Sequence, residues 1–186
     1  GTFHAFSAKC LRIYGCEGSV KRGGWGYLQT LDYSRLDGTF TIFDQNDCLK
    51  LVKELMKKAD IDESKVKPNS VLSTINSLRG NMALPDSHGS NLEEMKVGGN
   101  LLEQAASRLL LDYVNTLYKQ NAMDFEGLLI NMYQMLQHSD IQEKISNKYR
   151  HILVDEMQDT NRIQYEIIKA ICNDLHVTSQ DSQGNN

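Results

Sequence analysis

The sequence predicts an α/β fold, and two observations lead to this prediction. Residues 152–154 form a short apolar run, Ile-Leu-Val, which leads directly into the acids Asp155 and Glu156. Such a run is typical of a buried strand in a parallel sheet. In most other segments, apolar residues recur at helical spacing. Strands that alternate with helices define the α/β class.

Length and composition indicate a globular chain. Its 186 residues suffice for one ordinary domain or two small ones, and 40% of them are hydrophobic. The net charge of −4 does not indicate an extended nucleic-acid-binding surface. Any DNA contact therefore has to be local or shared with other parts of a longer protein. The chain begins at Gly1 without Met, from which we expect a piece of a longer protein.

The cysteines and the absence of long apolar runs predict an intracellular protein. The four cysteines form no Cys-x-x-Cys pair and have no His at zinc-ligand spacing, so we expect reduced thiols. No apolar run approaches the roughly 20 residues of a membrane span, and the start shows no signal-peptide pattern. No membrane partner is expected.

The first segment predicts a helix followed by a loop. Residues 1–14 carry apolar side chains at helical spacing, and Thr2 can cap the start of this helix. Residues 15–39 are rich in glycine, but no Lys-Ser/Thr pair follows these glycines, which excludes a phosphate loop here. Basic and aromatic side chains in this segment could touch DNA, although a solvated insertion is the favoured interpretation.

The middle of the chain predicts helices. Asp44 or Asn46 can cap a helix that continues to Ala59, and its lysines are better explained by a solvated face than by duplex DNA. Pro68 suits the first turn of the next helix and Gly80 its end, before a loop over residues 81–100. A long helix is expected from Leu101.

The last third predicts further helices around the strand. A helical stripe begins at Phe125, and the methionines near it are expected to fill the core. A short helix then leads into the strand. Another helix follows Asn161, with Asp159 and Thr160 as candidate caps. Leu175 could begin a further strand, before an almost wholly polar end.

The acids after the predicted strand are candidates for phosphoryl-transfer chemistry. Ligands of open α/β sheets bind at the carboxyl ends of the strands. There, Asp155 could hold Mg2+ while Glu156 orients or deprotonates an attacking water. A strand that simply ends in solvated acids explains the bare pattern equally well.

Three longer strings resemble one helicase family. Residues 155–161, Asp-Glu-Met-Gln-Asp-Thr-Asn, resemble motif II of the UvrD/Rep/PcrA branch of superfamily 1 DNA helicases. Thr2-Phe3-His4 looks like the segment with which these helicases help to contact single-stranded DNA. Residues 124–129 are similar to their Asp-Phe-Asp-Asp-Leu-Leu segment but depart from it at Gly127. The order of the three strings matches the family.

The resemblance implies a fold and a domain organisation. It implies a partial RecA-like P-loop NTPase core with a parallel sheet, interrupted by a mostly α-helical 1B subdomain. Residues 1–43 would form part of lobe 1A with the Gly-rich loop, and residues 44–122 the 1B subdomain. Residues 123–186 would return to lobe 1A, with the motif II strand and the helix after it.

The resemblance also implies site residues, cofactors and partners. Asp155 and Glu156 would bind ATP through Mg2+, with Glu156 as general base, and Gln158 would connect the nucleotide site to the DNA-bound state. Thr2, Phe3 and His4 would face DNA. The parent protein would be a 3′-to-5′ helicase or translocase in DNA repair or recombination. Its partners would be single-stranded DNA, duplex junctions and the remaining helicase lobes, in the cytoplasm of a bacterium or the nucleus of a eukaryote.

Several parts of such an enzyme cannot be recognised in this sequence. It contains no Gly-x-x-x-x-Gly-Lys-Ser/Thr phosphate loop, no recognisable arginine finger and no second lobe. Ser182 stands where the family has a glutamine that senses the γ-phosphate. We therefore expect the chain as given to hydrolyse no ATP, its sheet to be incomplete, and residues 151–154 to be poorly covered. The alternative is a non-catalytic DNA-binding or interaction module with a degenerate ATPase remnant. Within the helicase class, the parent protein could also be a helicase–nuclease of the RecB or AddA type.

Overall fold

The computed structural model of the chain describes residues 1–15, 38–82 and 99–172. Most of the predicted Gly-rich loop lies outside these residues. So do most of the loop predicted for residues 81–100, the strand expected from Leu175, and the polar end with Ser182.

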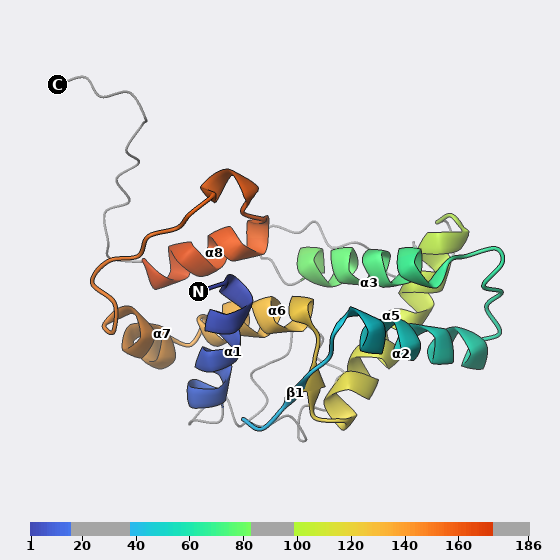
Figure 1. Cartoon of the computed structure of the whole chain (residues 1–186), viewed down its shortest axis with the longest axis horizontal. Helices are drawn as coiled ribbons and strands as arrows, with labels where there is room; N and C mark the ends of the chain where they lie inside the picture. Colours follow the sequence, from blue (N-terminus) through green and yellow to red (C-terminus); the bar gives the residue numbers. More distant parts are fainter. Residues whose placement is uncertain (16–37, 83–98, 173–186) are drawn as a thin grey trace.

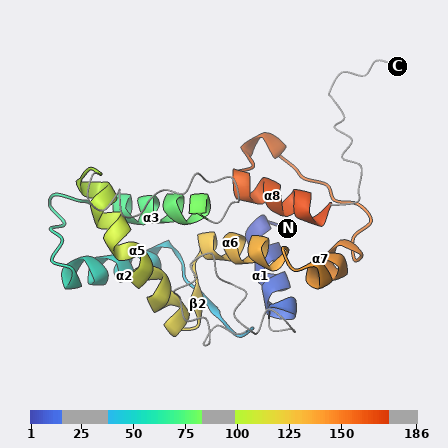
Figure 2. The ribbon, with the colours of Figure 1, turned by 180° about the vertical axis from the view of Figure 1, so that it is seen from behind.

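The described part of the chain is mostly helical (Figures 1 and 2). Its α-helices are α1 (Phe3–Tyr14), α2 (Gln45–Lys58), α3 (Pro68–Met82), α5 (Leu101–Lys119), α6 (Phe125–Met135), α7 (Ser139–Ser146) and α8 (Arg162–Ile171). A 3-10 turn, η2 (Met157–Asp159), precedes α8. Strands β1 (Thr41–Ile42) and β2 (Ala122–Met123) pair in parallel, with Thr41 opposite Ala122.

Local capping explains where several helices begin. The Thr2 hydroxyl accepts a hydrogen bond from the Ala5 backbone N–H at 3.2 Å, which confirms the predicted cap of α1. Asp44, rather than Asn46, caps α2 in a reciprocal capping box with Asp47. Asn100 does the same for α5. The prediction for Gly80 is wrong, because α3 continues through it to Met82.

Two hydrophobic cores organise the described residues. The first lies among α2, α3 and α5 and contains buried residues between Cys48 and Ala122. The second lies among α1, α6, α7 and α8, and it includes Phe40 and Met123. Figure 1 shows these two groups of helices at opposite ends of the molecule. The β1–β2 pair therefore lies where the chain leaves the second core and where it returns.

The predicted strand at residues 151–154 is not formed, and this part of the α/β prediction is wrong. The segment has no strand partner among the described residues, and Leu153 is 97% exposed while Ile152 packs partly against the second core. A strand is stabilised by hydrogen bonds to a neighbour, which local sequence cannot supply. The expected poor coverage of this segment is confirmed at Leu153. The observed fold, mostly helical with a small parallel sheet, is consistent with an α/β helicase domain.

The described residues bear on two further predictions. None of their helices combines the length and the apolarity that a membrane span requires. Cys10, Cys48 and Cys172 are free thiols, as expected. Burial raises the pKa of the Cys10 thiol and that of the Cys48 thiol to about 11, so both are protonated at neutral pH.

Candidate functional site

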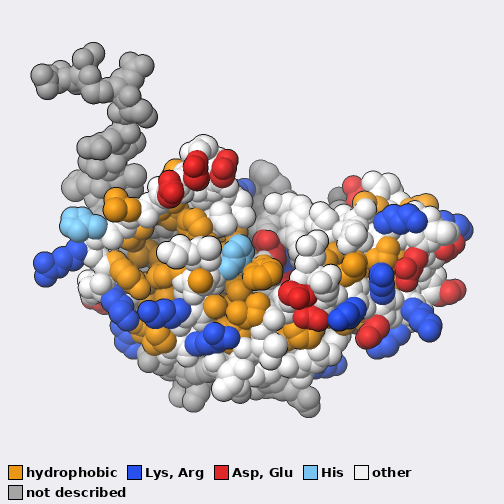
Figure 3. All heavy atoms as spheres, viewed as in Figure 1, with side chains coloured by type: hydrophobic (Ala, Val, Ile, Leu, Met, Phe, Trp, Pro, Cys, Tyr) orange, Lys and Arg blue, Asp and Glu red, His pale blue; other side chains and the backbone are white. Residues whose placement is uncertain are grey.

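The predicted ATPase acids lie on an exposed turn between α7 and α8. Asp155, Glu156 and Gln158 are all exposed, and Figure 3 shows a group of acidic side chains on this part of the surface. The Glu156 backbone N–H donates to Asp155 Oδ1 at 3.0 Å. The Gln158 side-chain amide donates to Glu156 Oε2. The structure thus brings the three predicted motif II residues together and orients the Glu156 carboxylate by a direct hydrogen bond.

The acid pair fits a magnesium ion that phosphates also ligate. Mg2+ is commonly bound by one or two carboxylates together with water and substrate phosphates. Asp155 and Glu156 are adjacent, exposed and free of salt bridges among the described residues, so their oxygens can serve as such ligands. Within residues 1–15, 38–82 and 99–172, no group of three or more His, Cys, Asp or Glu side chains could hold a metal ion by itself.

Glu156 has a strained backbone conformation. Its φ of 51° and ψ of 46° place it in the left-handed helical region. This region costs an L-residue other than Asn or Asp roughly 1–2 kcal/mol, and such strain is found disproportionately at functional sites. In the turn of residues 155–159, glutamate therefore occupies a backbone conformation that glycine would adopt at a lower energetic cost.

Replacing Glu156 by Gly is expected to raise the free energy of unfolding by up to about 1 kcal/mol, because glycine adopts positive φ without a Cβ clash. Glu156→Ala, which keeps the Cβ, should give no such gain. Urea denaturation followed by circular dichroism measures both variants. Equal stabilities of the two variants would show that the backbone at this position is not strained.

The cap of α8 differs from the prediction. Neither Asp159 nor Thr160 caps this helix. Asn161 does, in a capping box in which its Oδ1 accepts from the Gln164 N–H at 2.9 Å and its own N–H donates to Gln164 Oε1 at 3.1 Å. Asp159 instead belongs to η2, where its N–H donates to the Glu156 carbonyl. Residues 155–159 thus shape the turn, and Asn161, the last residue of the motif II string, starts the helix.

Asn161→Ala is expected to lower the free energy of unfolding by about 1 kcal/mol, since it removes a side-chain cap. Thr160→Ala should change it by less than about 0.5 kcal/mol. Thermal or urea unfolding separates the two. A larger loss from Thr160→Ala would contradict the assignment of the cap.

The predicted DNA-contact residues lie at the start of α1. Thr2 is exposed and caps the helix, while Phe3 packs partly against the second core. His4 is half-buried, and burial lowers its pKa below the ordinary value of 6.5, so it is mostly neutral at pH 7. Its ring meets the ring of Phe125 edge-on, with 5.3 Å between centroids and 76° between planes.

Phe125 is a candidate that the sequence did not reveal. Its helical spacing places it on the buried stripe of α6, but the side chain is 48% exposed and stands beside His4. An exposed ring next to an imidazole can stack on a base, so this pair is suited to contact single-stranded nucleic acid. The position of Phe125 directly after the capping residue Asp124 is the signal that could have indicated it.

The two groups of candidate residues are not joined directly. Among the described side chains and backbone atoms, no hydrogen bond or ion pair links residues 2–4 to residues 155–158. The acidic turn and the aromatic–imidazole pair are therefore not bonded to each other directly.

Comparison with known proteins shows that the chain is part of a helicase family. The sequence model described as "UvrD/REP helicase N-terminal domain" matches residues 1–179, and the chain belongs to this family, which confirms the resemblance. It is 29% identical over 171 residues to the ATP-dependent DNA helicase PcrA of Bacillus subtilis (strain 168), a match that covers 91% of this chain and 20% of PcrA. It is 31% identical over 166 residues to a probable DNA helicase II homolog of Rickettsia conorii (strain ATCC VR-613 / Malish 7), covering 89% of this chain and 22% of that protein.

A third relative has a similar identity and coverage. The probable DNA helicase II homolog of Mycoplasma capricolum subsp. capricolum is 29% identical over 183 residues, which covers 95% of this chain and 22% of that protein. The chain thus spans about a fifth of the length of the curated relatives it matches.

Proposed function

We propose that this chain is part of an ATP-dependent DNA helicase or translocase that moves 3′-to-5′ on single-stranded DNA and acts in repair or recombination inside the cell. The family match over residues 1–179 carries this proposal. Relatives named as DNA helicases support it. The cofactors would be ATP and Mg2+, and the partners single-stranded DNA, duplex junctions and the remaining lobes of the parent protein.

The acidic turn would serve ATP hydrolysis. Asp155 would ligate Mg2+, and Glu156 would take the proton of the attacking water. The hydrogen bond from Gln158 to the Glu156 carboxylate supports a role for Gln158 in orienting this base, and through it in linking hydrolysis to the DNA-bound state. The chain by itself would be inactive, because no segment of its sequence is recognised that would hold the phosphates. A Mg2+-dependent ATPase of the isolated chain that disappears in Glu156→Gln would refute this.

The two cores support the proposed domain organisation. Residues 44–122 would form the helical 1B subdomain, since buried residues from Cys48 to Ala122 pack with one another. Residues 1–43 and 123–186 would belong to lobe 1A, because α1, Phe40 and α6 share the second core. The β1–β2 pair would close the junction between the two parts.

The start of α1 would contact single-stranded DNA. The exposed Thr2 and the half-buried His4 can donate to phosphate oxygens, and Phe125 beside them can stack on a base. Because His4 is mostly neutral, its contact would be a hydrogen bond rather than an ion pair.

The second candidate function is a non-catalytic DNA-binding or interaction module. Gly127, where the family pattern has an acid, favours it, and so does the segment 151–154, which has no strand partner in the described part of the chain. The intact string Asp155–Thr160 disfavours it, because no structural role of the turn requires all of these residues. The two candidates share the DNA contact and differ in ATP hydrolysis.

The 186-residue chain is expected to bind a fluorescein-labelled oligothymidylate, and His4→Ala to weaken this binding about tenfold, since a hydrogen bond to a charged phosphate is worth about 1.5 kcal/mol or more. Fluorescence anisotropy at low salt measures the affinity. Tyr165→Ala on α8 is the matched control, an aromatic ring that is 49% exposed, and it should bind like wild type. Binding that is absent, or unchanged in His4→Ala, would rule out the proposed DNA contact.

A further inference from the structure

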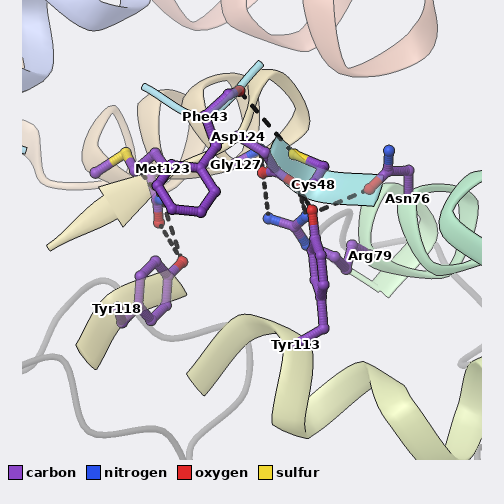
Figure 4. A network of polar contacts seen from close by, with 10 residues as sticks. Phe43, Cys48, Asn76, Arg79, Tyr113, Tyr118, Met123, Asp124 and Gly127 are labelled. Atoms are coloured by element: carbon purple, nitrogen blue, oxygen red, sulfur yellow. Dashed lines mark hydrogen bonds and ion pairs between the residues drawn. The ribbon is translucent and has the colours of Figure 1, made fainter. Parts of the chain in front are cut away.

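A buried ion pair joins the two cores at Asp124, the residue that precedes Phe125. Arg79 from α3 binds Asp124 through two contacts, Nη1 to Oδ2 at 2.5 Å and Nη2 to Oδ1 at 3.0 Å. The side chains are only 1% and 4% exposed. The Tyr113 hydroxyl of α5 donates to Oδ2 at 2.8 Å, and the Gly127 backbone N–H donates to Oδ1 at 2.8 Å (Figure 4).

This network leaves the Asp124 carboxylate a single orientation. Both of its oxygens accept two hydrogen bonds, and the bidentate geometry of a guanidinium fixes the plane of the carboxylate. Asp124 is also the N-cap of α6, so its orientation sets how that helix begins. Phe125 is the first residue of the helix. A buried ion pair adds little stability compared with apolar packing. The stability of the fold therefore does not explain why this pair is present, whereas the fixed orientation that it gives to Asp124 can.

The glycine at position 127 is linked to this ion pair. A Cβ at Gly127 would lie 2.8 Å from Asp124 Oδ1, closer than real Cβ contacts allow, and 3.0 Å from Arg79 Nη2, which is tighter than most of them. Glycine is disfavoured inside a helix relative to alanine, so its presence here needs a packing reason. The space is occupied by the carboxylate of Asp124 and the guanidinium of Arg79. A side chain at position 127 would therefore meet the Asp124–Arg79 ion pair, which gives a packing reason for glycine where the family pattern has an acid.

We propose that Arg79 is a positioning residue: through Asp124 it fixes the start of α6 and so holds the Phe125 ring beside His4 for contact with a single DNA strand. This inference rests on the proposed function, in which the start of α1 faces DNA. Arg79 itself is fully buried, so it would act only through Asp124 and Phe125. It ties α3 of the first core to the DNA-contact pair of the second core, so that a shift of α3 against α6 moves Phe125 with it.

The test uses the double variant Arg79→Met/Asp124→Asn in the whole 186-residue chain. Asn can still cap α6 and accept from Tyr113, and Met fills part of the space of the arginine stem, so neither buried charge is left alone. We expect the circular dichroism spectrum of wild type, a loss of the nuclear Overhauser contact between the His4 and Phe125 rings, and an affinity for oligothymidylate that is about tenfold lower. Arg108→Met, at an exposed arginine of α5, is the matched control and should change neither readout.

Two readouts separate this inference from the proposed function. A folded double variant that keeps both the ring contact and the wild-type affinity would overturn the positioning role. If wild type binds no DNA, the proposed DNA contact fails, and the ring contact alone decides whether Arg79 positions Phe125. If the double variant does not fold, Gly127→Ala takes its place, since its methyl group intrudes on the ion pair while favouring the helix. A Gly127→Ala chain with the ring contact and affinity of wild type would also refute the proposal.

Discussion

Asp124→Ala is expected to lower the free energy of unfolding by about 3–5 kcal/mol, the loss typical of breaking a buried ion pair from one side. The variant leaves the Arg79 guanidinium buried without its carboxylate and removes the acceptor of the Tyr113 hydroxyl. It also removes the cap of α6. Urea denaturation followed by circular dichroism measures the effect.

Asp44→Ala is the matched control, because Asp44 is also an aspartate N-cap but is exposed. Its loss should be about 1 kcal/mol. If Asp124→Ala costs no more than Asp44→Ala, the ion pair does not hold the two cores together.

The same network predicts how stability depends on pH. Burial alone would raise the pKa of Asp124, but Arg79, the Tyr113 hydroxyl and the Gly127 N–H together hold it below the ordinary value of 3.8. A carboxyl whose pKa is lower in the folded state contributes stability that is full above the unfolded value. This contribution is lost as the pH falls through the folded pKa. In Asp124→Asn the corresponding loss of stability on acidification should be smaller than in wild type.

Glu156→Gln is expected to slow ATP hydrolysis by about 100-fold or more in a helicase that contains this segment, because an amide cannot accept the proton of the attacking water. The isolated chain is expected to be inactive, so the test uses B. subtilis PcrA with its aligned segment replaced by this chain. The KM for ATP should change little, since glutamine keeps the shape of the side chain. Asp140→Asn, the same change of charge at an exposed position of α7, should leave the rate unchanged. A Glu156→Gln chimera that hydrolyses ATP at the unchanged rate would remove Glu156 from the role of general base.

The helices could be predicted from the sequence because their determinants are local. Apolar spacing and capping residues such as Thr2 and Asp44 lie within the segment that they organise. The strand at residues 151–154 has the right composition, but its partner has to come from elsewhere, and none lies beside it in the described residues. Local patterns therefore predicted the helices well and this strand wrongly.

The candidate site was predictable only in part for the same reason. The string of residues 155–161 and the Thr2–His4 segment are contiguous, so a resemblance could identify them. Arg79 and Asp124 are 45 residues apart, and no local pattern pairs them. The one local sign of their contact is Gly127, an unexpected residue whose missing side chain leaves room for the Asp124 carboxylate and the Arg79 guanidinium.

The most direct test of this account is the rate of ATP hydrolysis by the PcrA chimera that carries this chain unchanged. We expect Mg2+-dependent hydrolysis that single-stranded DNA stimulates, because Asp155, Glu156 and Gln158 would then face phosphates held by the rest of the enzyme. A chimera that folds and binds ATP but does not hydrolyse it, with or without DNA, would refute the catalytic role of these residues and identify the segment as a non-catalytic remnant.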